Sequence, residues 1–432
     1  MGVLNYAYNL FLNRLFVPAD YATYVALMGL LAIITVPVSA LQAIAAKYAA
    51  EYRAAKKTGL VRQLLWGLTR RVLPVGLIAF VVFMLAPKLV AEFLGAGKAD
   101  SVILAVKVMG TAFLLQVLLP INRGLLQGLQ NFASLSFNFA LDAISRFGIG
   151  LLIFLPLLGG FSWPLLHSVL NGSLKLTTAN AVALGIAVTI IGSSLAYLVS
   201  FWPLRKLPKN KATGEDIDSK DILRFSWPTL LMFVFLAILF NVDVVLVKHF
   251  SGPGLGISLD NAGEYATIST LAKIVYFITG PIIAVMFPMI SDLVGRGEKH
   301  FKLLLLTLFT VLSSALVVLG VFAALPNTVV GALTPNYISV ANLLVPMTVI
   351  FVVYSLVNLM SNYYLSIRQY GFIWPLGFFA LMEVILINFF HGSMMEVIKS
   401  AIMAQTLLLF VFMLLYLSGK KNQLQEIFRR YE

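Results

Sequence analysis

The chain has 432 residues, of which 60% are hydrophobic and 11% charged, and its mean hydropathy is +0.93. Soluble proteins are about half apolar and a quarter charged, so this composition excludes a soluble fold and predicts an integral membrane protein. The absence of cysteine excludes disulfides and thiolate metal sites, and the net charge of +13 is interpreted as a topology signal rather than as nucleic-acid binding.

Twelve apolar segments, each expected to be a membrane helix, recur along the chain. A helix needs about 20 apolar residues to cross the hydrocarbon layer, and strands of a membrane barrel would instead alternate polar and apolar residues. The first segment is short, since about 15 residues reach only about 23 Å. The segments cover residues 2–16, 21–46, 71–95, 101–121, 132–157, 179–203, 225–247, 265–290, 302–325, 338–365, 371–390 and 394–417.

The loops between the segments alternate in charge. Lys and Arg collect after every second segment, which predicts that both termini face the cytoplasm and that the chain lies in the cytoplasmic membrane. The polar stretch 205–223 predicts a linker between an N-terminal six-helix bundle, 1–204, and a C-terminal six-helix bundle with a short cytoplasmic tail, 224–432. Residues 47–71 are predicted either as an interfacial amphipathic helix or as a solvated basic loop.

An internal repeat relates the two halves. The stretch DYATYVALMGLLAIITVP at 20–37 and the stretch EYATISTLAKIVYFITGP at 264–281 share an acid–Tyr–Ala–Thr opening and a Thr-x-Pro ending. Six is an even number, so duplicated six-helix halves enter the membrane in the same direction, related by a two-fold axis along the membrane normal. Chance similarity of apolar sequences is the alternative. Weaker matches pair Pro87 with Pro326 and Gln130 with Gln369.

Two co-oriented bundles around a central cavity predict a transporter that works by alternating access. Pro37 and Pro281 fall in the middle of paired segments. Each removes a backbone hydrogen bond, and we expect them to bend their helices around the cavity or to act as gates. The alternative is that they reflect only the high frequency of proline in membrane helices.

The N-terminal stretch LNYAYNLFLNRLFVPADYATYVALMGLLAIITVPVSALQAIAAKYAAEY resembles the opening of bacterial polysaccharide flippases, the Wzx-like oligosaccharide flippases. In that family the first helix ends in an Arg-Leu-(Leu/Phe)-x-Pro-x-acid-aromatic segment, matched here from Arg14 to Tyr21. The resemblance extends to the twelve-segment, six-plus-six layout of the superfamily, which includes lipid II flippases and multidrug exporters of the MATE type. The first helix here is shorter than is usual in the family, so either it tilts less than its neighbours or the natural start lies upstream of Met1.

The resemblance implies a flippase for an undecaprenyl-diphosphate oligosaccharide, moved from the cytoplasmic to the outer leaflet for polysaccharide or cell-surface glycan synthesis. The expected partners are this lipid-linked cargo, membrane lipids and a glycan polymerase or glycosyltransferase. The chain itself is expected to act as a monomer. No nucleotide-binding loop or hydrolase motif occurs in the sequence, so neither enzymatic activity nor a cofactor is expected, and coupling to Na⁺ or H⁺ is an open option.

Cations within segments are the first candidates for binding the diphosphate, because charged residues in spans are costly and face protein or water. Lys273 lies near the predicted midplane with no acid within one helical turn. Arginine binds two phosphate oxygens at once. Arg123 could do so at the inward mouth, but its position favours the interpretation as a topology-setting cation. Asn5 and Asn9, with Asn13, line one face of the first helix and are interpreted either as sugar ligands or as interhelical contacts. The candidate cations are Arg14, Lys107, Arg123, Arg146 and Lys273.

Three acids within segments are candidates for coupling or gating. Asp142 lies four residues before Arg146, so a structural ion pair within one helix is the alternative. Asp243 and Glu383 are interpreted either as ion-coupling groups or as partners of nearby lysines. A second hypothesis, an ion-coupled multidrug or metabolite exporter of the same superfamily, predicts that a carboxylate rather than a cation dominates the cavity.

Overall fold

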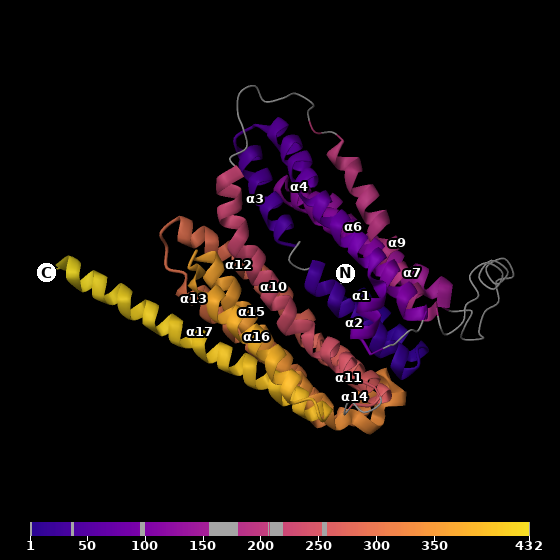
Figure 1. The fold of residues 1–432 in the computed structure, drawn as a ribbon. Helices are drawn as coiled ribbons and strands as arrows, with labels where there is room; N and C mark the ends of the chain where they lie inside the picture. The colour runs from indigo at the N-terminus through magenta and orange to yellow at the C-terminus, as the bar shows by residue number, and fades with distance from the viewer. Residues whose placement is uncertain are drawn as a thin grey trace. The chain divides into compact units, whose positions relative to one another are not determined.

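The computed structural model describes residues 2–35, 39–95, 100–154, 180–205, 207, 219–252 and 257–431, and these residues are almost entirely helical (Figure 1). Eleven helical stretches in these ranges are long and apolar enough to cross a membrane, and they match the second to twelfth predicted segments. The first segment forms α1 (Gly2–Leu15), a helix of 14 residues. The predicted all-α, multi-pass membrane fold is therefore confirmed.

The chain folds into two compact units. Unit 1 comprises Met1–Phe233 with Lys248–Thr267, and unit 2 comprises Val234–Val247 with Ile268–Glu432. Two helices, α10 (Ser219–His249) and α11 (Leu259–Ala272), contribute residues to both units. The predicted boundaries of the linker and the two six-helix bundles stay predictions.

Unit 1 is built around α6, which packs against α3, α4 and α9. Gly124 and Gly128, four residues apart on α6, lie directly on the backbone of α3, where an added Cβ would meet the carbonyl oxygens of Gln42 and Ala46. Small residues at this spacing let two membrane helices approach closely. The helices that lie wholly in unit 1 are α1, α2 (Pro18–Thr35), α3 (Ser39–Ala54), α4 (Thr58–Leu85), α5 (Pro87–Phe93), α6 (Asp100–Gly128), α7 (Phe132–Phe154) and α9 (Ala181–Leu204).

Unit 2 is built around α15, which packs against α12, α13 and α17. Polar side chains connect these helices: the hydroxyls of Thr279 and Ser355 are 2.9 Å apart, and the Tyr364 hydroxyl donates to the Phe412 carbonyl at 2.7 Å. The elements that lie wholly in unit 2 are α12 (Ile274–Gly295), α13 (Phe301–Ala324), α14 (Pro326–Leu333), η4 (Pro335–Leu343), α15 (Leu344–Ser366), η5 (Tyr370–Phe372), α16 (Ile373–Phe389) and α17 (Met394–Tyr431).

The same helix endings recur in the two units. Shortly after each of four helices the chain passes through a residue of positive φ. The backbone N–H of the residue that follows it donates to the carbonyl five positions before that donor, which is the Schellman arrangement. The residues of positive φ are Lys56 after α3 and Gln130 after α6 in unit 1, and Gly297 after α12 and Arg368 after α15 in unit 2. Pro87 and Pro326 each begin a short helix, as the repeat predicts. The counterpart of Gln130 is Arg368, so the predicted pairing with Gln369 is wrong by one position.

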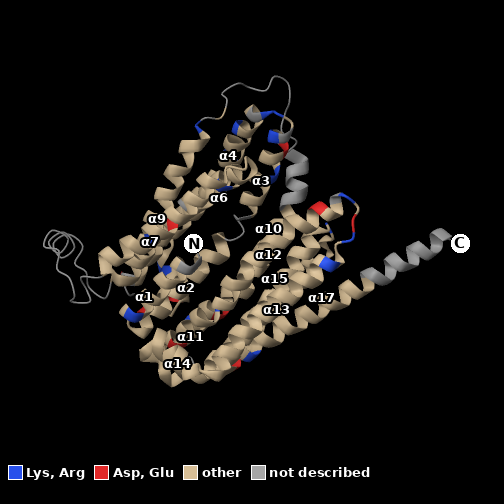
Figure 2. Cartoon of the chain, turned by 180° about the vertical axis from the view of Figure 1, so that it is seen from behind, with Lys and Arg blue, Asp and Glu red and all other residues tan. Residues whose placement is uncertain are grey.

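The basic stretch 47–71 is helical apart from one turn, so the prediction of a loop over this stretch is wrong, whereas its place at the membrane interface stays a prediction. Helix α3 continues to Ala54 and α4 begins at Thr58, so the two membrane helices extend through the stretch and are joined by a turn of three residues. Arg53, Lys56 and Lys57 are exposed at this turn. Charged residues gather at such helix ends, whereas the middles of the helices are largely uncharged (Figure 2).

Candidate functional site

Unit 1 contains a buried ion cluster formed by Arg123, Asn138, Asp142 and Arg146, here named the Asp142 cluster. The two carboxylate oxygens of Asp142 accept from different arginines, Oδ2 from Arg123 Nη2 at 2.9 Å and Oδ1 from Arg146 Nη2 at 3.1 Å. Arg123 Nε donates to Asn138 Oδ1 at 2.7 Å. One acid is therefore shared by two cations, and the cluster carries an excess positive charge.

Three helices position this cluster. Asn138, Asp142 and Arg146 are each four residues apart on α7 and so lie on one face of that helix. Helix α6 supplies Arg123, whose guanidinium lies 4.3 Å from the ring centre of Phe139. Helix α9 accepts a hydrogen bond from Asn138 Nδ2 at the Ala196 carbonyl, 2.6 Å away. Asn138 thus links the Arg123 guanidinium to the backbone of α9.

Arg146 is the member of the cluster with unused hydrogen-bonding capacity. The Asp142 side chain is 2% exposed and that of Arg123 9%, whereas the Arg146 side chain is 14% exposed. Arg146 Nε is buried and has no hydrogen-bond partner among the described residues. Gly192 of α9 leaves room beside it, since an added Cβ would lie 3.3 Å from the Arg146 Cβ. A phosphate oxygen is the kind of acceptor that Arg146 can still bind.

The remaining predicted substrate contacts of unit 1 lie elsewhere. Arg14 at the end of α1 and Lys107 within α6 are exposed on the surface of the unit. Asn9 donates from Nδ2 to the Asn5 carbonyl at 2.9 Å, and Asn13, which is 1% exposed, donates to the Thr267 hydroxyl at 2.7 Å. Asn13 is therefore a contact between helices, whereas the half-buried Asn5 and Asn9 lie nearer the surface.

In unit 2, Lys273 lies where α11 meets α12. Its Nζ donates to Asn241 Oδ1 at 3.3 Å and lies 4.7 Å from the ring centre of Phe240 and 5.8 Å from that of Phe351. Lys273 also interacts electrostatically with Asp243 on the same helix as Asn241. An amide oxygen, two aromatic faces and a carboxylate therefore surround this ammonium group, as cation–π geometry favours.

A second group of polar residues in unit 2 surrounds Glu383 of α16, which is 0% exposed. Gln405 Nε2 of α17 donates both to Glu383 Oε2 at 3.0 Å and to the Leu239 carbonyl at 3.1 Å. Glu383 Oε1 is buried without a hydrogen-bond partner in the described part of the chain. Asp243, which is 2% exposed, acts electrostatically on Glu383. The polar centre of unit 2 therefore contains two acids and one lysine.

Each unit buries an acid in the helix that follows one of the Schellman endings. Asp142 lies twelve residues after Gln130, whereas Glu383 lies fifteen residues after Arg368, because the short helix η5 precedes α16. Arg123 corresponds to Ser361 when Gln130 is aligned with Arg368. In the same alignment Asp142 and Arg146 correspond to Ala380 and Val384, so the repeat extends neither to the acid nor to its arginine partners.

Three polar residues in these clusters were not predicted from the sequence: Asn138, Asn241 and Gln405. Each interrupts an otherwise apolar stretch close to a charged residue, and Asn138 lies four residues before Asp142. That spacing could have indicated Asn138, but the pairing of Gln405 with Glu383 joins residues of different helices and needs the tertiary structure. Pro281 lies inside α12 and is exposed, whereas Pro37 lies outside the described residues, so their gating roles stay predictions.

Comparisons with known proteins identify a family and a fold. A family model described as "polysaccharide biosynthesis protein" matches residues 17–294, more than half of the chain. No curated protein matches the sequence significantly. The chain is similar to an inward-facing multidrug resistance MATE transporter of the MOP superfamily, with a TM-score of 0.74 and 13% identity over 98% of this chain and 96% of that one.

Two further solved structures share the fold. The lipid II flippase MurJ aligns with a TM-score of 0.65 and 14% identity over 96% of this chain and 85% of that one. A MOP superfamily transporter from Pyrococcus furiosus aligns with a TM-score of 0.63 and 14% identity over 95% and 91% of the two chains. The predicted resemblance to the flippase and exporter superfamily is thereby confirmed at the level of the fold.

Proposed function

The chain belongs to the polysaccharide biosynthesis protein family, and from this membership we propose that it is a flippase for a lipid-linked oligosaccharide. It turns an undecaprenyl-diphosphate glycan from the cytoplasmic to the outer leaflet by alternating access of its two units. The family match carries this proposal, and the fold shared with transporters of the MOP superfamily supports it.

The physical task is to move a diphosphate and its sugars across about 30 Å of hydrocarbon while the lipid tail stays in it. A dianionic group needs cations that are already oriented, since ordering them at each cycle would cost binding free energy. The Asp142 cluster supports this requirement, because Asp142 and Asn138 hold two arginines in fixed orientations and the cluster has an excess positive charge.

Within the cluster we assign the contact with the diphosphate to Arg146, and a supporting role to Arg123. The partly exposed Arg146 has a free Nε, whereas Arg123 is engaged by Asp142, Asn138 and Phe139. The other predicted cargo contacts, Arg14, Lys107, Lys273, Asn5 and Asn9, stay predictions.

Energy for transport comes, in this proposal, from a cation bound at Asp243 and Glu383. Two acids buried near one lysine leave a negative charge that H⁺ or Na⁺ can neutralise, and an uncompensated buried charge is unfavourable. Binding and release of that cation would then bias unit 2 between two states. The protein would act as a monomer in the cytoplasmic membrane, with both termini inside, beside a glycan polymerase or glycosyltransferase.

The test is flipping of a fluorescent diphosphate-linked oligosaccharide by the full chain in vesicles. Arg146→Ala is expected to lower the initial rate of flipping at least about tenfold, because the loss of a desolvated charge contact weakens binding of the diphosphate by at least that factor. The matched control is Arg296→Ala, since Arg296 also pairs with an acid four residues earlier but at an exposed helix end. Equal rates for both variants would contradict the assignment of Arg146.

An ion-coupled exporter of cationic drugs or metabolites is the second candidate function, favoured by the two buried acids of unit 2. It predicts uptake of a cationic dye into inverted vesicles that is driven by an ion gradient. It also predicts no flipping of the oligosaccharide. Measuring both activities with the same protein preparation separates the two candidates.

A further inference from the structure

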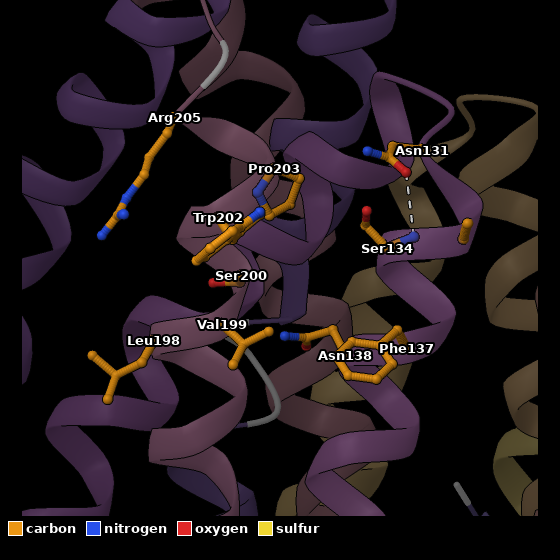
Figure 3. A pocket seen from close by; sticks show the side chains of 11 residues that line it. Asn131, Ser134, Phe137, Asn138, Leu198, Val199, Ser200, Trp202, Pro203 and Arg205 are labelled. Carbon is orange, nitrogen blue, oxygen red and sulfur yellow. Dashed lines mark hydrogen bonds between the residues drawn. The ribbon is translucent and has the colours of Figure 1, made fainter.

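A cavity of about 640 Å³ opens between α7 and α9 of unit 1 (Figure 3). It is large enough for part of a lipid-sized ligand, since ligand sites are typically about 300–1,000 Å³. It lies where α7 begins and α9 ends, and Arg205, which directly follows α9, lines it. By the charge distribution of the loops, this end of the helices is predicted to face the cytoplasm.

The cavity has a polar end and an apolar end. Arg205, Asn131 and Ser134 lie at the end nearest the helix termini, and Phe137 and Leu198 lie deeper along the same two helices (Figure 3). Arg205 and Leu198 are seven residues apart, about 10 Å along a helix. That distance matches the depth over which a bilayer changes from headgroups to acyl chains.

The apolar part of the cavity is open to the surroundings of unit 1. Trp202 is 72% exposed, Leu198 66% and Phe137 59%. Large apolar side chains exposed together at one site mark an interaction surface, and a tryptophan at a helix end near the membrane interface sits at headgroup level.

The polar groups at the floor of the cavity are already satisfied by the protein. Ser200 accepts from Asn122 Nδ2 at 2.7 Å, and Asn138 is held by Arg123 and the Ala196 carbonyl. The floor therefore accepts an acyl chain without leaving a buried polar group unpaired. Among the described residues that line the cavity, Arg205 is a cation and none is acidic, so the charge at the rim favours an anionic headgroup.

From these features we propose that the α7–α9 cavity binds an anionic phospholipid of the cytoplasmic leaflet, with its headgroup at Arg205 and an acyl chain along Trp202, Leu198 and Phe137. Because Asn138 both lines the cavity and orients Arg123, the bound lipid contacts the Asp142 cluster through one residue. This site is separate from the proposed contact of Arg146 with the cargo.

Quenching of tryptophan fluorescence by brominated lipids tests this proposal on the full chain. A variant that keeps Trp202 alone, with the other four tryptophans replaced by phenylalanine, is placed in bilayers that contain brominated phosphatidylglycerol or brominated phosphatidylcholine. One arginine near the surface favours an anionic lipid about fivefold. Half-maximal quenching is therefore expected at an about fivefold lower fraction of phosphatidylglycerol than of phosphatidylcholine.

The matched control keeps Trp374 alone, which is 83% exposed near the start of α16 and is not among the residues of the cavity. It is expected to show no preference between the lipids.

Arg205→Gln should remove the preference at Trp202, and Ala133→Phe, which fills the cavity without changing charge, should do the same. Equal quenching by both lipids, or the same preference at Trp374, would overturn the proposal. So would relief of the quenching by an equimolar amount of lipid-linked oligosaccharide, since the cavity would then bind cargo.

Discussion

Asp142 in unit 1 and Glu383 in unit 2 are both buried acids in a helix that follows a Schellman ending, yet their surroundings differ. Two arginines bind Asp142, one of them held by Asn138, whereas among the described residues Glu383 has one hydrogen bond, from Gln405. A carboxylate shared by two cations is compensated within the protein, and a buried carboxyl without a cationic partner depends on an external one. The two buried acids are thus expected to have different roles, in a structural ion cluster in unit 1 and in a proposed coupling site in unit 2.

The largest expected effect is from Arg123→Ala in unit 1. The substitution removes one of the two cations from Asp142 and leaves the side-chain oxygen of Asn138 unpaired, and breaking a buried ion pair costs about 3–5 kcal/mol. The free energy of unfolding, measured by denaturant titration in micelles, is expected to fall by about that amount. An exposed control, Arg296→Ala, should change it by less than about 1 kcal/mol. A loss as small as that of the control would show that the Asp142 cluster contributes little to stability.

The next effect is the contrast between Asp142→Asn and Glu383→Gln, two isosteric changes that remove a charge. Asp142→Asn leaves two arginines facing each other and is expected to destabilise the protein by about 2–3 kcal/mol. Glu383→Gln creates no unpaired charge and is expected to leave the free energy of unfolding within about 1 kcal/mol, but to abolish the dependence of flipping on an ion gradient.

The contrast is measured with the same denaturant titration and with flipping assays in the presence and absence of a Na⁺ or H⁺ gradient. Equal destabilisation by the two substitutions would remove the distinction between the units. Unaltered gradient dependence in Glu383→Gln would remove the coupling role of Glu383.

A smaller effect is expected from Lys273→Gln in unit 2. The amide keeps a donor for Asn241 but loses the cation–π contact with Phe240 and the charge that interacts with Asp243. Cation–π contacts contribute about 0.5–2 kcal/mol, and the free energy of unfolding should fall by about that much. Lys273→Arg, which keeps the charge, should lose less. If both variants match the parent protein, Lys273 has no role within the packing of unit 2 and its predicted role in cargo binding gains weight.

The smallest effect concerns pH at the polar ends of the helices. Partial burial lowers the pKa of His300, which precedes α13 and lies 3.3 Å from the Tyr363 hydroxyl, below its ordinary value of about 6.5. The folded state therefore favours the neutral ring. The stability that this contributes is present above the unfolded pKa and is lost as the pH falls through the folded value.

Thermal unfolding between pH 7.5 and pH 5.5 checks this expectation. The loss of stability on acidification is expected to be slightly smaller in His300→Gln than in the parent protein. The corresponding turn of unit 1 carries Lys56 and Lys57 and no histidine, so Lys57→Gln should leave the pH dependence unchanged. A larger acid sensitivity in His300→Gln than in the parent protein would mean that folding raises the pKa of His300 instead of lowering it.

The sequence by itself determined the class of the protein and the course of its helices. The length of the apolar segments and the need to satisfy backbone hydrogen bonds leave helices as the one way to place this composition in a bilayer. The spacing of Asp142 and Arg146 indicated their ion pair as one of two alternatives. Local rules could not say where α3 ends, because the basic stretch 47–71 suits both a loop and a helix. Only the tertiary structure decided which residues of different helices meet, Arg123 with Asp142, Lys273 with Asn241 and Glu383 with Gln405. The physical reason is that these pairings are set by how helices approach and rotate against one another, as at Gly124 and Gly128, and not by the period of any one helix.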